Sequence, residues 1–259
     1  SRDLQHLDLG SNSITDVSSL DINNKLKRVA LNDNNISDIA CFNNNFEDLT
    51  YLNISNNSVT SIEPLTNCKK LDTLAIANNK IQSLKGLENN TKLEILAAAY
   101  NQISDISSLK ASVGKLDKVD LAYNQISDAS VFAGMDTSSY KIGFLLLEHN
   151  NITDISWIPN GACFGMLSLY ANNIADITSF NKLKDIYSIL FSYNSQIDFS
   201  FFNKSKFGLG WIGCVDAPDN KKNDIDKTFK YEVVTFCTAE EADAKCLEYR
   251  TNLAEYAQN

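Results

Sequence analysis

The stretch that decides the fold is Leu71–Leu87, LDTLAIANNKIQSLKGL. Its apolar residues and one asparagine give the skeleton LxxLxLxxNxIxxLxxL, and this skeleton recurs along most of the chain. We call the asparagine of each copy its anchor. The anchors follow one another at about 22 residues, with one longer step, and they are Asn12, Asn34, Asn57, Asn79, Asn101, Asn124, Asn150, Asn172 and Asn194. This periodicity predicts a repeat array.

Each anchor follows three apolar residues at fixed distances, such as Leu26, Val29 and Leu31 before Asn34. Their alternation has a period of two, which predicts a short strand with one buried face. One copy alone cannot bury that face, whereas stacked copies share a continuous core. We therefore expect nine copies to form one parallel sheet.

The anchor amide can both donate and accept hydrogen bonds, so it can satisfy backbone groups inside a buried turn. The nine anchors are therefore predicted to form a hydrogen-bonded asparagine ladder. An aspartate also recurs four residues after most anchors, as at Asp38 and Asp128. Turn capping is the interpretation that we favour for these aspartates. A cation-binding acidic stripe is the alternative.

At these residues the chain resembles the leucine-rich-repeat family, from about Leu4 to Ile197. The short period and the ISDI continuation at Ile36–Ile39 are similar to those of the repeats in bacterial internalins and in regulatory subunits of protein phosphatase-1. The resemblance implies an α/β solenoid, a right-handed horseshoe with a parallel sheet on its concave face. Short 3₁₀ or irregular segments would form the convex side. It also implies a non-catalytic protein-recognition function.

We predict two regions: an array over 1–198, with nine repeats and no N-terminal cap, and a C-terminal cap over 199–259. The aromatic-rich stretch that ends at Trp211 is expected to cover the open core of the last repeat. Residues 229–236 alternate like a strand. Thr238–Glu241 is a capping box that opens a helix over 239–256. We expect this helix to lie on the end of the solenoid; a docking helix for another domain or subunit is the alternative.

Composition argues against several classes of function. The net charge of −9 and the pI of 4.7 disfavour binding to nucleic acid or to an anionic membrane. No apolar run is long enough for a transmembrane helix, so no membrane insertion is expected. The cysteines have no metal-ligand spacing, although Cys237 and Cys246 could pair. His6 and His149 lie too far apart to share a site. No catalytic residue, metal or cofactor is predicted.

The concave face is the predicted binding surface. Residues six, four and two positions before each anchor alternate with the buried ones and so face outward. They are small or polar in the first four copies and become apolar from the fifth. Apolar patches of this kind usually mark interaction sites. The tyrosines directly before three anchors are predicted to form a rim along one edge. We call the predicted partner-binding residues, rim included, the concave patch: Ile95, Tyr100, Tyr123, Phe144, Leu146, Met166, Tyr170, Leu190 and Tyr193.

Other readings of the concave patch remain open: the C-terminal cap could fold back over it, or a homodimer could bury it. By resemblance to internalins, the expected function is ligand binding or adhesion by a bacterial surface or secreted protein. The alternatives are a cytoplasmic regulatory scaffold and a recognition module of a larger enzyme.

Overall fold

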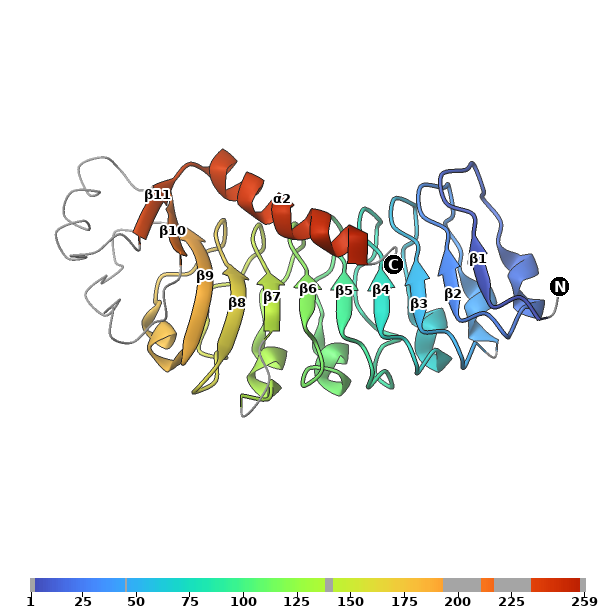
Figure 1. Ribbon diagram of the computed structural model, residues 1–259, viewed down its shortest axis with the longest axis horizontal. Coiled ribbons are helices and arrows are strands. Elements are labelled where there is room, and N and C mark those ends of the chain that lie inside the picture. Colours follow the sequence, from blue (N-terminus) through green and yellow to red (C-terminus); the bar gives the residue numbers. More distant parts are fainter. Residues whose placement is uncertain (1–2, 45, 138–141, 193–210, 217–233, 257–259) are drawn as a thin grey trace.

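A computed structural model describes residues 3–44, 46–137, 142–192, 211–216 and 234–256. Its strands form one parallel sheet in chain order, which confirms the predicted solenoid (Figure 1). The strands described are β1 (His6–Asp8), β2 (Arg28–Ala30), β3 (Tyr51–Asn53), β4 (Thr73–Ala75), β5 (Ile95–Ala97), β6 (Lys118–Asp120), β7 (Ile142–Leu146), β8 (Cys163–Ser168), β9 (Asp185–Ser192), β10 (Trp211–Val215) and β11 (Val234–Cys237).

Neighbouring copies stack in register, so equivalent residues form columns. Leu74 pairs with Leu52 on one side and with Leu96 on the other, and all three side chains are fully buried. Burying such a side chain stabilises the fold by about 1.5–3 kcal/mol. This column of stacked leucines forms the centre of the solenoid core.

Short 3₁₀ helices follow six of the strands, as the sequence predicts for the convex side. They are η1 (Ser18–Ile22), η2 (Ala40–Asn43), η3 (Glu63–Asn67), η4 (Ser107–Ala111), η5 (Ser130–Gly134) and η6 (Thr178–Lys182). The recurring aspartates cap the turns before them. Asp38 accepts a hydrogen bond from the N–H of Ala40, and Asp128 accepts one from Ser130, both at 2.8 Å. The turn-capping interpretation therefore accounts for them.

The anchor asparagines tie each copy to the one before it. Asn79 donates from Nδ2 to the carbonyls of Ile54 (3.0 Å) and Ile76 (3.1 Å), and its Oδ1 accepts the N–H of Val59 (2.9 Å). The same pattern recurs at Asn34, Asn57, Asn101, Asn124, Asn150 and Asn172. Asn12 bonds within its own copy, and Asn194 lies outside the described residues.

Replacing Asn150 with alanine is expected to lower the free energy of unfolding by about 2–4 kcal/mol, because buried partners lose their hydrogen bonds. Its Nδ2 donates to Leu121 and Leu147, and its Oδ1 accepts from Ile126. Asn151 is an exposed neighbour and supplies the matched control. Urea unfolding should show Asn151→Ala within about 0.5 kcal/mol of the parent. Equal effects at the two positions would contradict the ladder.

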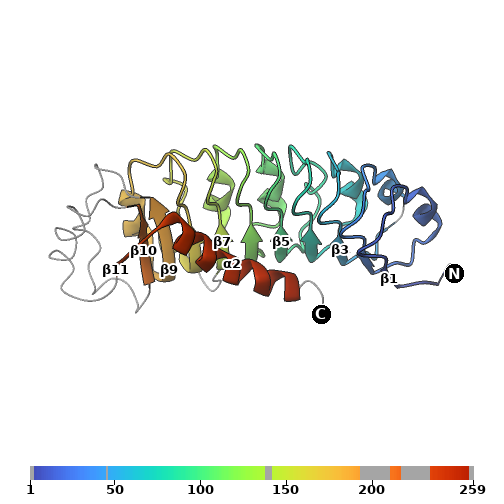
Figure 2. The ribbon, with the colours of Figure 1, turned by 90° about the horizontal axis from the view of Figure 1, so that it is seen from above.

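The C-terminal region differs from the prediction in two ways. Trp211 belongs to β10, which pairs with β9 and continues the sheet beyond the last repeat. Helix α2 (Ala239–Tyr256) has the predicted bounds, but it lies across the concave face rather than on the end of the solenoid (Figures 1 and 2). The expected end cap is therefore wrong for α2. The predicted boundary at 198 and most of strand 229–236 lie outside the described residues.

Candidate protein-binding face

The structure brings the centre of the concave patch together beneath α2. Its five central residues belong to one apolar cluster with Ala242, Cys246 and Leu253 of α2, separate from the solenoid core. Those five residues are Phe144, Leu146, Met166, Tyr170 and Leu190, and each is at most 4% exposed. Their predicted orientation towards the concave side agrees with this clustering. The expectation that they form an open surface is wrong, because α2 covers them.

The remaining members of the patch lie around this centre. Ile95 and Tyr123 are half-buried and pack against the cluster, whereas Tyr100 is 42% exposed. Tyr193 lies outside the described residues. Whether any of the nine contacts an external partner stays a prediction.

The predicted capping box starts α2. The N–H of Thr238 donates to Oε2 of Glu241 at 2.7 Å, and the N–H of Glu241 donates to Oγ1 of Thr238 at 3.2 Å. These bonds satisfy backbone donors that a helix start leaves free. They fix the direction in which α2 leaves β11. The ring of Tyr249 then packs edge-on against Phe144, with centroids 5.7 Å apart.

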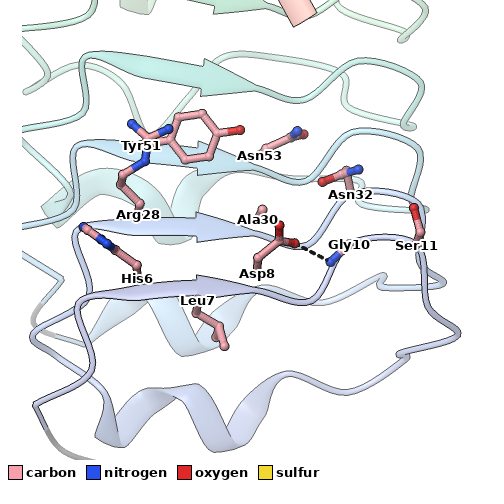
Figure 3. A pocket seen from close by; sticks show the side chains of 10 residues that line it. All are labelled: His6, Leu7, Asp8, Gly10, Ser11, Arg28, Ala30, Asn32, Tyr51 and Asn53. Carbon is pink, nitrogen blue, oxygen red and sulfur yellow. Dashed lines mark hydrogen bonds between the residues drawn. The ribbon is translucent and has the colours of Figure 1, made fainter. Parts of the chain in front are cut away.

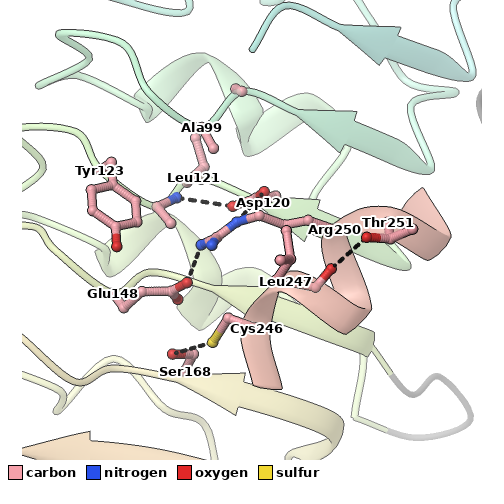
Figure 4. A network of polar contacts seen from close by, with 12 residues as sticks. Ala99, Asp120, Leu121, Tyr123, Glu148, Ser168, Cys246, Leu247, Arg250 and Thr251 are labelled. Carbon is pink, nitrogen blue, oxygen red and sulfur yellow. Dashed lines mark hydrogen bonds and ion pairs between the residues drawn. The ribbon is translucent and has the colours of Figure 1, made fainter. Parts of the chain in front are cut away.

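An ionic centre lies under the second half of α2, and the sequence analysis missed it. Arg250 donates from Nε to Asp120 at 3.0 Å and from a terminal nitrogen to Glu148 (Figure 4). Both carboxylates are almost fully buried. Burial raises the pKa of Asp120 above its ordinary value, and Arg250 opposes that shift. Burial likewise raises the pKa of Glu148 to about 7, although Arg250 favours its charged form.

A second polar contact holds the first half of α2 at the edge of the sheet. The hydroxyl groups of Tyr123 (2.8 Å) and Tyr170 both donate to Asp243, and Nε2 of His149 lies 3.7 Å from the same carboxylate. The ring of Tyr123 stacks between Tyr100 and His149, with centroid distances of 4.3 and 4.1 Å. We call Tyr100, Tyr123, His149 and Tyr170 the aromatic edge.

The backbone under the aromatic edge carries strain. The residue before each described anchor has a positive φ, and in the first copies it is a small or polar residue such as Asp33 or Asn56. Tyr100, Tyr123 and His149 adopt the same conformation at φ values of 57°, 55° and 53°. Bulky side chains there cost roughly 1–2 kcal/mol each. The contacts of these rings with one another and with α2 help to offset this cost.

The signals for these missed residues were present in the sequence. Asp120 and Glu148 stand four and two residues before their anchors, at positions already predicted to face the concave side. Asp243 and Arg250 are seven residues apart, so they lie on one face of the helix. What the sequence lacked was any indication that this helix and this part of the sheet meet.

Exchanging Glu148 for glutamine is expected to strengthen α2 docking at pH 8. The docked state raises the pKa of Glu148 from its ordinary 4.5 to about 7. Protonation of Glu148 therefore stabilises the docked state. This stabilisation is fully present below pH 4.5 and is lost as the pH rises through 7. Thermal loss of the helical circular dichroism signal should occur at a higher temperature in Glu148→Gln at pH 8, with little difference at pH 4.5.

The exposed Glu248→Gln on α2 is the control for this comparison and should show no such pH dependence. Burial lowers the pKa of His149, which opposes docking on acidification. His149 is present in both proteins, so its effect cancels in the difference. A Glu148→Gln advantage that is equal at the two pH values would contradict the account.

The concave face remains open over the first strands, where we define the open half by His6, Asp8, Arg28, Tyr51 and Asn53. These residues line a hollow of about 700 Å³ (Figure 3). The guanidinium of Arg28 lies 4.2 Å from the centroid of the Tyr51 ring. Asp8 accepts a hydrogen bond from the N–H of Gly10 at 2.9 Å. The open half thus presents charged and amide groups on a rigid sheet, with the buried ring of Tyr51 supporting Arg28.

No cluster of three or more histidine, cysteine or acidic residues in the described ranges could hold a metal ion. Cys237 and Cys246 are both free thiols. Across the same part of the chain, no helix has the length and apolar character needed to cross a bilayer. His6 belongs to the open half and His149 to the aromatic edge, so the two histidines contribute to different surfaces.

Comparison with known families matches two segments of the chain. Residues 47–89 match the family described as Leucine Rich repeats (2 copies), and residues 1–18 match Leucine Rich repeat. A Dictyostelium discoideum protein named "Probable inactive serine/threonine-protein kinase" is 41% identical over 68 residues. That match spans 26% of this chain and only 3% of the relative.

Solved internalins of Listeria monocytogenes have the same architecture. Internalin C2 aligns with a TM-score of 0.64 and 22% identity over 72% of this chain and 80% of its own. A second internalin (inlF) aligns with a TM-score of 0.58 and 26% identity over 92% of this chain and 76% of its own. With the repeat and the sheet described above, these matches make the chain a leucine-rich-repeat protein that resembles the internalins.

Proposed function

We propose that this chain is a non-catalytic recognition module that binds a protein partner on its concave face. The proposal rests on the arrangement of side chains in the open half. A rigid parallel sheet holds Arg28 and Tyr51 beside Asp8 and Asn53 around one hollow. Arginine and tyrosine are enriched at the centres of protein interfaces. Their fixed positions on the strands limit the entropy lost on binding.

The setting that we propose is the surface or the secreted proteins of a bacterium, where the chain would bind a ligand or mediate adhesion. The likeness to internalins supports this setting. A second candidate is a recognition segment of a larger protein. The Dictyostelium relative supports it, because the matched segment is a small part of a long protein.

Affinity capture with the immobilised chain tests this function. Two inputs are used: extracellular matrix and host-surface proteins, and a lysate of the source organism. Arg28→Glu reverses a charge in the open half, and Lys110→Glu makes the same change on the exposed 3₁₀ helix η4. A specific extracellular partner retained by Lys110→Glu and lost by Arg28→Glu is the expected result.

A cytosolic partner with the same dependence on Arg28 would instead support the alternative that the protein is a cytoplasmic regulatory scaffold. A partner that both variants retain equally would place binding outside the open half and contradict the proposal.

A further inference from the structure

Helix α2 occupies a surface that closing the array does not require. The ends of a solenoid are stabilised by elements that cover the exposed core. Instead, α2 runs back from β11 along the concave face, and its contacts reach Asp120 on β6 (Figures 1 and 4). A partner bound on the concave face, as the proposed function has it, would lie in the same position.

The apolar sides of this contact fit closely. The sheet contributes Phe144, Leu146 and Met166, which are large apolar side chains and at most 4% exposed. On α2, Ala242, Cys246 and Leu253 are buried in the same cluster and Tyr249 packs against Phe144, whereas Leu247 is 58% exposed. Apolar stabilisation grows with the buried area. A competing helix must therefore match this apolar contact.

The charges across the contact are unequal. Arg250 is the one guanidinium described between two buried carboxylates, Asp120 and Glu148. Oε2 of Glu148 is buried and has no hydrogen-bond partner among the described residues. A buried acceptor without a donor costs about 1–3 kcal/mol, and more when it is charged. Docking of α2 leaves this cost in place.

The position next to that oxygen is occupied by Cys246, one helical turn before Arg250. Its thiol donates to Oγ of Ser168 at 3.4 Å, beside Glu148 (Figure 4). A thiol is a weak donor. A helix with a hydroxyl or basic group at this place would supply the donor that Glu148 lacks.

We propose that the surface beneath α2 is a second binding site, which accepts an arginine-bearing amphipathic helix of a partner protein, with α2 as its intramolecular competitor. The arginine takes the place of Arg250 between Asp120 and Glu148. A hydrogen-bond donor one turn earlier takes the place of Cys246. This inference goes beyond the proposed function, because the site is separate from the open half.

Competition with a tethered helix sets the affinity that a partner needs. A short connection such as Thr238 gives an effective concentration on the order of millimolar. An external helix no better than α2 is therefore mostly excluded. A partner that satisfies Glu148 and matches the apolar contacts of α2 gains the free energy to replace it.

The test uses the full chain and a fluorescent peptide with the sequence of residues 239–256, followed by anisotropy. Two hosts are compared: the parent chain and Arg250→Met, in which the internal competitor is weakened. The peptide should bind the Arg250→Met host at least tenfold more tightly than the parent. A peptide that itself carries Arg250→Met should bind neither, and a Cys246→Ser peptide should bind more tightly than the unsubstituted one.

Two further hosts keep the result interpretable. Arg250→Lys retains a cation, so it should give an intermediate peptide affinity if the Arg250→Met host is folded poorly. Arg28→Glu alters only the open half and should leave peptide binding unchanged, which separates this site from the proposed function. Equal binding of the unsubstituted and Arg250→Met peptides, or no binding to any host, would overturn the proposal.

Discussion

The Arg250→Met chain is expected to lose docked α2 while its solenoid stays folded. Asp120 and Glu148 would be left buried without their guanidinium partner. Removing one member of a buried ion pair typically costs 3–5 kcal/mol. An isolated helix of this length is only marginally stable in water, so circular dichroism should show a loss of helical signal.

Lys245→Met is the matched control, since it removes a cation from the same helix. Lys245 pairs with Glu248 at 2.8 Å on the exposed side of α2, and exposed pairs contribute about 0–1 kcal/mol. Chymotrypsin should cleave after Tyr249 much faster in Arg250→Met than in Lys245→Met. Equal protection of Tyr249 in both variants would show that the ionic centre does not hold the helix.

Joint replacement of Phe144 and Leu190 by aspartate is expected to have the larger effect on α2. Both side chains lie in the cluster beneath the helix. A buried carboxylate without a partner costs several kcal/mol, so α2 should leave and expose both groups to water. The strands should persist, because neither side chain enters the solenoid core. Circular dichroism should therefore lose its helical part and keep its sheet part.

The adjacent residues provide the opposite control. Leu145 and Ile189 are next in sequence to Phe144 and Leu190, but they lie in the solenoid core. Leu145→Asp with Ile189→Asp should unfold the second half of the array. If both double variants lost the strands to the same extent, the assignment of alternate residues to two faces would be wrong.

The sequence was sufficient for the solenoid because its information is local and repeated. Every copy repeats the same spacing, so the departure of the last copy, which has Gln196 two residues after its anchor where the others have Ile or Val, does not obscure the pattern. The spacing of the apolar residues identified Leu74 as core and Phe144 as concave, and the structure places both accordingly. The capping box at Thr238 predicted the start of α2, and the spacing of the apolar residues after it predicted the length.

The sequence did not predict in the same way which surface α2 packs against. A helical pattern shows which residues share a face, but not which surface that face meets. Ala242 and Cys246 are small, so their stripe gave no strong preference for the end of the array over its concave side. The ionic centre depends on that long-range contact, since Arg250 and Asp120 are 130 residues apart. β10 was missed because its aromatic-rich surroundings resembled a core cover.

The concave face of this protein is therefore divided between two surfaces. The open half presents Arg28, whose guanidinium lies over the buried ring of Tyr51, and the second half is held closed through Arg250 and Asp243. A hollow of about 280 Å³, lined by Tyr100, Arg250 and Leu253 among others, lies between them. Asn53 lines both this hollow and that of the open half, so the two surfaces adjoin.

Hydrogen–deuterium exchange of the unmodified chain at neutral pH tests the central claim most directly. The measured quantity is the exchange rate of backbone amides in 239–256. If α2 is docked on the concave face, these amides should exchange slowly, at rates near those of the strands beneath it. Exchange as fast as in an unstructured peptide would show that α2 does not close the second half of the concave face, and both the ionic centre and the competitor proposal would fall with it.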